Sequence, residues 1–244
     1  MKKIVLCLFA ACSLTGCSKE TSTFKNSDIQ NSVARTDTWE SLCDIPNSSN
    51  PYDFVGSEHN RIMAKCDEAK YDGMSLSDVY NVTDRILMEE ELISEPETEE
   101  FASPGIRSFE SEASLRSYIN SVTRTDIAKT EINNLVTITL QYDGTNLCET
   151  ISEIKKFEEG LLEKYSSSAV AGVLAASSVS RYSLAYWHER EVAGAGDAVP
   201  TGWFRDFIVG LADAIGAHTG YERAGWIGAI SGAIEYSSTA DAYF

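Results

Sequence analysis

Hydrophobic residues recur at steps of three and four along most of the chain, which is the spacing of one face of an α-helix. A short run, 136–140, could form a strand by itself, but the longer helical rhythm around it favours a helix. No period-two alternation recurs over several segments, so the sequence predicts an all-α bundle of amphipathic helices. The helices are expected over residues 50–67, 75–93, 109–122, 126–142 and 147–165, with a helical continuation over 166–188.

Polar residues at the expected helix starts support this reading. Asn50 precedes Pro51, and these residue types are favoured at the N-cap and at the first helical position. Ser75 is followed three residues later by Asp78, a spacing close to a capping box. Whether the serines at 166–168 kink or break the helical run is left open by the sequence.

The segment from 203 to 236 is rich in Gly and Ala. Gly costs about 1 kcal/mol relative to Ala inside a helix, so close helix–helix approach is the expected compensation. We therefore expect a Gly/Ala-rich C-terminal helical hairpin packed on the bundle. Self-assembly or membrane insertion of this segment is the alternative, although charged side chains interrupt its apolar stretches. The expected packing positions are Gly216, Gly220, Gly225, Gly228 and Gly232, with Gly225 one turn before Ala229.

The amino-terminal end has a different pattern. Lys2 and Lys3 precede an apolar run over 4–12, which is typical of a secretory signal and too short for the roughly 20 residues of a membrane span. Residues 14–17, Leu-Thr-Gly-Cys, resemble the lipobox of bacterial lipoproteins. The resemblance implies that Cys17 becomes the first residue, carries fatty acids such as palmitate and anchors the protein in a membrane. Ordinary secretion with an unmodified Cys17 is the alternative.

The residues after Cys17 bear on location. In Gram-negative lipoproteins an Asp at this place favours retention in the inner membrane, whereas this chain has Ser18. The resemblance thus implies the outer membrane, and the Ser-Lys-Glu run at 18–20 is similar to short charged tags of surface-exposed lipoproteins. The expected organisation is a signal peptide (1–16), a lipidated N-terminus and flexible tether (17–49), a helical domain (50–190), a linker (191–201) and a Gly-rich helical tail packed on the domain (202–244).

The strongly negative net charge of the chain argues against one class of binding partner, nucleic acids. The full chain has a formal net charge of −17, and residues 1–16 contribute two lysines and no acidic residue, so the mature chain would carry −19. A polyanion is repelled by nucleic acid phosphates, and we expect no nucleic acid partner. A protein or glycan partner stays open.

Three cysteines, Cys43, Cys66 and Cys148, remain beyond the signal and Cys17. Either one disulfide with one thiol left over or three buried thiols would fit this odd number. No CxxC pair is present, so neither a zinc ribbon nor a redox site is indicated.

The segment 50–60, Asn-Pro-Tyr-Asp-Phe-Val-Gly-Ser-Glu-His-Asn, resembles one found in envelope proteins of gut bacteria. Those proteins often carry a Ser/Ala-Tyr-Trp segment, as at 183–187 here, and a Gly-rich tail. The resemblance implies an envelope class and brings no activity with it. Read physically, Gly56 would let another backbone approach closely, and His59 lies on the apolar stripe, where a core histidine or a general base would fit.

The candidate functional residues are His59, Glu58, Asn60 and His188. His218 stands four residues before Glu222, which places both on one helix face if the helix continues through Gly220. No HExxH, GxSxG or phosphate-binding loop is present, so no catalytic residue, metal or cofactor is assigned. The sequence favours a non-enzymatic binding or structural module, with a His59-dependent envelope hydrolase or metal enzyme as the alternative, or a membrane-active tail.

Overall fold

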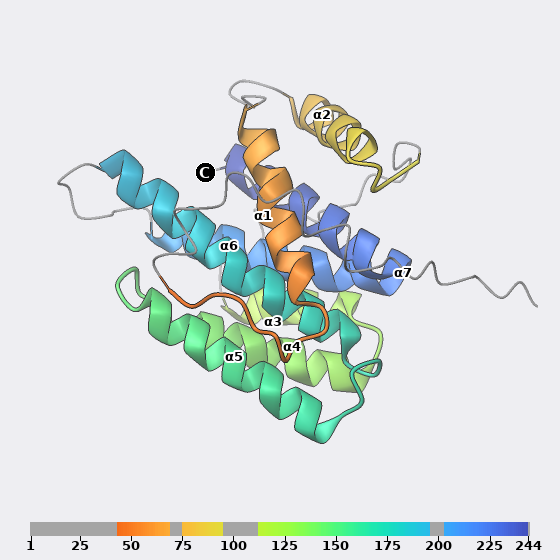
Figure 1. The fold of residues 1–244 in the computed structure, drawn as a ribbon, viewed down its shortest axis with the longest axis vertical. Helices are drawn as coiled ribbons and strands as arrows, with labels where there is room; N and C mark the ends of the chain where they lie inside the picture. Colours follow the sequence, from red (N-terminus) through yellow and green to blue (C-terminus); the bar gives the residue numbers. More distant parts are fainter. Residues whose placement is uncertain (1–42, 69–74, 95–111, 196–202, 244) are drawn as a thin grey trace, which may run out of the picture. The chain divides into compact units, whose positions relative to one another are not determined.

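The computed structural model describes residues 43–68, 75–94, 112–195 and 203–243 (Figure 1). The expected signal peptide, Cys17 and the tether as far as residue 42 lie outside the described residues. All the described helices belong to one compact unit, residues 36–244.

The described residues form seven α-helices and no strand, which confirms the predicted all-α fold. The segment 136–140, which could have formed a strand by itself, is helical except for Leu140. The helices are α1 (Asp53–Glu68), α2 (Leu76–Glu89), α3 (Glu112–Val122), α4 (Asp126–Thr139), α5 (Leu147–Lys164), α6 (Ala171–Ala195) and α7 (Trp203–Tyr243).

Helix α6 is the centre of the bundle. It packs most extensively against α7 and then against α1, and it also contacts α4 and α5. Figure 1 shows α3, α4 and α5, in green, gathered on one side of α6, with α2, in yellow, at the opposite edge of the view. Every residue from 173 to 187 is buried. A helix buried on all sides needs neighbours all round it, and these four helices supply them.

Local capping positions several helix starts. The N–H of Asp78 donates to Ser75 Oγ at 3.2 Å, so the predicted cap of α2 is confirmed. Thr125 caps α4 in the same way by accepting from the N–H of Ala128 at 3.1 Å. Helix α1 begins at Asp53 and not at Pro51 as expected, because Pro51 and Tyr52 form a turn in which Asn50 Oδ1 accepts from the N–H of Tyr52 at 2.9 Å.

The structure settles the open question at residues 166–168 and extends the helix that follows them. Helix α5 ends at Lys164 and Tyr165 is extended, so the serines at 166–168 lie in a break between two helices. Helix α6 then runs on to Ala195, into the linker expected over 191–201. Its last residues include Ala193 and Ala195, and Ala is the strongest helix former. The rest of that linker lies outside the described residues.

The predicted C-terminal hairpin is confirmed. The backbone of α7 leaves helical geometry at Ala224 and Gly225 and divides it into two halves. Gly216 faces Gly232 and Gly220 faces Gly228 across the hairpin, so closely that a Cβ on any of the four would overlap the carbonyl oxygen of its opposite number. These four glycines therefore serve the close packing that the sequence predicted.

The prediction that Gly225 also serves this helix packing is wrong. Its φ is +67°, a region in which side chains with a Cβ are strained, and a Cβ there would meet nothing within 4 Å. It serves the turn between the two halves of α7.

Candidate ligand-binding cavity

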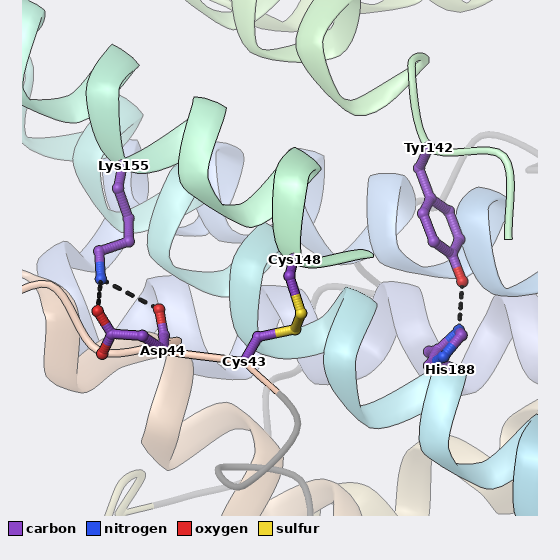
Figure 2. Close-up of a disulfide and its surroundings, with 6 residues drawn as sticks. All are labelled: Cys43, Asp44, Tyr142, Cys148, Lys155 and His188. Carbon is purple, nitrogen blue, oxygen red and sulfur yellow. Dashed lines mark hydrogen bonds and ion pairs between the residues drawn. A yellow bond between two sulfur atoms is a disulfide. The ribbon is translucent and has the colours of Figure 1, made fainter. Parts of the chain in front are cut away.

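A disulfide joins the start of the described chain to α5. Cys43 pairs with Cys148 across 105 residues, with the two Cα atoms 5.3 Å apart. Figure 2 shows the bond beside a second link, in which Lys155 Nζ donates to Asp44 Oδ2 at 2.8 Å and to the Asp44 carbonyl oxygen at 3.0 Å. Cys66 remains a buried thiol. Of the two alternatives that the sequence left open, the structure has one disulfide and one thiol.

Arg181 of α6 is fully buried and joins three chain segments. Its Nε and Nη2 donate to Glu158 Oε1 at 3.2 and 3.1 Å, Nη2 also donates to Asp53 Oδ1 at 2.5 Å, and Nη1 donates to the carbonyl oxygen of Ile45. Burial alone would lower the pKa of Arg181, but Glu158 and Asp53 raise it above its ordinary value. A buried cation with two carboxylates and a carbonyl around it is a satisfied structural centre.

The carboxylate of Glu158 is equally well surrounded. It accepts from Asn47 at 2.6 Å, from Asn50 at 2.8 Å and from Ser177 at 2.8 Å, besides Arg181. Burial raises its pKa, and these donors oppose that shift. The cluster holds the segment 43–50 against α5 and α6.

His59 and Asn60 lie together inside the bundle. His59 is fully buried, with Nδ1 3.1 Å from Asn60 Oδ1 and Nε2 3.7 Å from Asp213 Oδ2 of α7. Asn60 donates in turn to the carbonyl oxygen of Tyr182 at 2.8 Å. Burial lowers the pKa of His59 to about 4, against the opposing effect of Asn60, so the ring is neutral at pH 7. Asn60 is therefore the residue that links α1 to α6, whereas His59 Nε2 has no hydrogen-bond partner among the described residues.

Glu58 and His188 belong to other surroundings. Glu58 accepts from Arg61 Nε at 2.8 Å, within α1. His188 Nδ1 lies 2.7 Å from the hydroxyl oxygen of Tyr142, and Figure 2 shows this pair bridging α6 and the end of the α4 segment. The four candidates from the sequence thus do not form one site, although His59 and Asn60 do lie together.

Gly56 has the packing role that the sequence predicted. Its N–H donates to Ser178 Oγ at 3.2 Å, and a Cβ at this position would lie 2.7 Å from the carbonyl oxygen of Ser178. Helices α1 and α6 therefore cross almost backbone to backbone at this point.

A cavity of about 300 Å³ opens where three chain segments meet. The first segment is the start of α4, the second is the turn before α6 with the first residues of α6, and the third is the end of the first half of α7. The lining residues used below are Arg124, Val170, Gly172, His218, Tyr221 and Glu222.

The first turn of α6 faces this cavity without a polar cap. The residue before α6 is Val170, whose side chain has no atom that can accept a hydrogen bond. The N–H groups of Val173 and Leu174 both donate to the Val170 carbonyl oxygen at 2.9 Å. The N–H groups of the two preceding residues belong to the part of a helix that has no acceptor within it, where the helix dipole concentrates partial positive charge.

His218 lies against that turn. It is only 3% exposed, and neither ring nitrogen has a hydrogen-bond partner among the described residues. Nε2 is 3.5 Å from Glu222 Oε1, and Nδ1 is directed at Gly172, since a Cβ on Gly172 would lie 3.0 Å from it. The helix does continue through Gly220, as the spacing of His218 and Glu222 required.

Glu222 lies beside Arg124 and His218. Arg124 Nε lies 3.6 Å from its Oε2, and the backbone N–H of Arg124 donates to Oε1 at 3.4 Å. Burial tends to raise the pKa of Glu222, but His218 and Arg124 outweigh it and hold the pKa below its ordinary value. The carboxylate is therefore ionised at neutral pH and lies within ion-pair distance of Arg124.

A second cavity of about 200 Å³ shares Arg124 and Glu222 with the first. It is lined by Tyr118 and Tyr236, whose hydroxyl oxygens are 2.7 Å apart. Burial raises the pKa of both phenols, so they stay protonated. This side of the hairpin is therefore hollow and polar.

Sequence reasoning noticed the pair His218 and Glu222 but not the cavity. Arg124 and Gly172 carry no signal of their own, because they are distant in sequence and only the tertiary fold places them beside His218. An apolar residue directly before a long helix is the one local sign that could have drawn attention to the start of α6.

Among the described residues, no group of three or more His, Cys, Asp and Glu side chains could hold a metal ion. None of the described helices combines the length and apolar character needed to cross a bilayer. Comparison of the chain with family models, curated proteins and solved structures found no match.

Proposed function

We propose that the chain is a non-enzymatic binding protein of the bacterial envelope, held at the outer membrane by a lipid on Cys17. The observation that carries this proposal is the disulfide between Cys43 and Cys148. Disulfides persist in oxidising compartments such as the periplasm and the cell surface. This agrees with the export signal read from residues 1–17.

The binding role rests on the cavity at the start of α6. Its volume of about 300 Å³ is at the lower end of the range for ligand pockets. The buried polar cluster around Arg181, by contrast, is occupied by contacts within the protein, and His59 is fully buried. The cavity is thus the described feature best suited to a small ligand.

The two alternatives gain less support. A general base must come within hydrogen-bond reach of a substrate, and His59, on which the enzyme alternative depends, is fully buried. The membrane-active alternative needs the glycine stripe of α7 to meet another surface. Four of its glycines instead pack against each other inside the hairpin.

Mass spectrometry of the protein purified from membranes of a Gram-negative host tests the anchor. We expect a chain that begins at Cys17 and carries a diacylglycerol and an amide-linked fatty acid. The variant Cys17→Ser should lose the lipid and leave the membrane fraction, whereas Cys66→Ser, the matched control, should keep both. A wild-type chain that begins at Met1 without fatty acid would refute the proposal.

A further inference from the structure

We infer that the cavity at the start of α6 binds the oxyanion group of a small organic acid, a carboxylate or a phosphate monoester, between the first turn of α6 and Nδ1 of His218. The inference deepens the binding role proposed above and is independent of the lipid anchor. Its two components are the N–H groups in the first turn of α6 and a buried nitrogen of His218 that has no hydrogen-bond partner among the described residues.

The first component is the helix N-terminus. The N–H groups of Ala171 and Gly172 stand in the first turn of a 25-residue helix, behind an apolar Val170. Such a terminus presents N–H donors and partial positive charge, and oxyanions are its usual ligands.

The second component is His218. A buried imidazole is normally hydrogen-bonded, because burying a polar group without a partner is unfavourable. His218 is buried, its Nδ1 has no partner among the described residues, and this nitrogen is directed at Gly172 in the same turn of α6. An oxygen atom placed between the two would accept from both.

The surrounding charges fit an anion. Nε2 of His218 is directed at Glu222, which leaves Nδ1 to face the ligand. The negative charge of Glu222 is opposed by Arg124, whose side chain is 69% exposed and reaches solvent beside the cavity. Tyr221 is the remaining titratable group of the cavity wall. Its hydroxyl donates a hydrogen bond to the Tyr52 hydroxyl oxygen, and burial raises its pKa, so it stays neutral.

The rest of the wall limits the ligand to a small one with an apolar part. Several lining residues are apolar, and the cavity volume of about 300 Å³ suits an acid with a short hydrocarbon body rather than a nucleotide. The apolar lining residues are Ala128, Ala169, Val170, Ala171 and Val173.

Thermal unfolding of the mature full-length protein in detergent tests the inference, with acetate, butyrate and inorganic phosphate as probes and sodium chloride at equal ionic strength as the reference. A probe at about ten times its dissociation constant should raise Tm by about 3–6 °C over chloride. If carboxylates are the preferred ligands, each methylene that enters the cavity tightens binding about fourfold, so butyrate exceeds acetate. If phosphate alone binds, the ligand is a phosphate monoester.

Three variants locate the site. In His218→Gln the amide takes the place of Nε2 and nothing replaces Nδ1, so binding should weaken at least tenfold. His218→Asn puts an amide at the place of Nδ1 and should recover part of the affinity. Gly172→Ala places a methyl group between the helix and Nδ1 and should also weaken binding, whereas Gly160→Ala, whose Cβ meets nothing within 4 Å, should leave it unchanged.

Two results would overturn the inference that the cavity binds an oxyanion. A wild-type protein that no probe stabilises beyond chloride up to about 50 mM would overturn the inference, and so would equal binding by wild type and Gly172→Ala. Should His218→Gln fail to fold, the glycine variants still decide. Loss of binding with a normal lipid on Cys17 refutes only this inference, and binding by a protein without lipid refutes only the anchor.

Discussion

Replacing Gly220 by Ala tests whether the two halves of α7 are in direct backbone contact. A Cβ at Gly220 would lie 2.6 Å from the carbonyl carbon of Gly228 and closer still to its oxygen. Carbon atoms in contact are normally about 3.5–4.0 Å apart, so the two halves would have to separate by roughly 1 Å. The obstructing atoms are backbone, and no flexible side chain can move aside to relieve the overlap.

Two effects of opposite sign set the size of the change. Ala is favoured over Gly in a helix interior by about 1 kcal/mol, which would stabilise the variant. Overpacking costs about 1–3 kcal/mol, and a gap of this width also forfeits a quarter to a half of the dispersion energy along the seam. We expect a net loss of about 2 kcal/mol in the free energy of unfolding.

Urea unfolding followed by circular dichroism, with the disulfide intact, measures this difference. The matched control is Gly160→Ala in α5, where a Cβ meets nothing within 4 Å and only the propensity gain of about 1 kcal/mol is expected. The two variants should therefore move in opposite directions, about 3 kcal/mol apart. If Gly220→Ala proved as stable as Gly160→Ala, the close packing of the hairpin would be wrong.

Two further predictions concern covalent and acid–base contributions to stability. Replacing Cys43 and Cys148 together by Ser removes a cross-link across 105 residues and should lower the free energy of unfolding by about 2–4 kcal/mol in urea titrations, a loss that reductant reproduces in the wild type. A change within error would contradict the pairing. Burial holds the pKa of His59 at about 4 when folded, against 6.5 when unfolded, so the unfolded chain takes up the proton first as pH falls. Stability should drop by about 1.4 kcal/mol per pH unit between 6.5 and 4, about 3 kcal/mol in all, with His59→Asn as the flatter reference. An NMR titration of the His59 ring with a midpoint at or above 6.5 would show that the charge of Asp213 outweighs burial.

Much of the fold could be predicted because its determinants are local. Helix positions follow from apolar residues three and four apart, and the cap at Ser75 follows from residues within one turn of it. The sequence likewise predicts the close approach at Gly56 and the glycine pairs of the hairpin. Inside a helix, a residue without a Cβ is most often explained by close packing against a neighbouring backbone.

The candidate site could be predicted from the sequence only in part. His59 was selected for its residue type and its neighbours in sequence, but its full burial depends on α6 and α7, which follow more than 100 residues later. Gly225 looked like another packing glycine, since the pattern of small residues does not reveal where a helix turns back. The cavity could not be predicted because its wall combines three segments that are far apart in the sequence, and no one of them contains more than half of the lining residues.

The amino-acid sequence by itself determined the all-α class, most helix positions and the hairpin, since each depends on residues within a few turns of one another. Only the tertiary structure decided which cysteines pair, that His59 lies closed inside the bundle and that His218 meets the start of α6. These features join residues 46–154 positions apart. Their contacts depend on the angles at which the helices pack, and no local pattern encodes those angles.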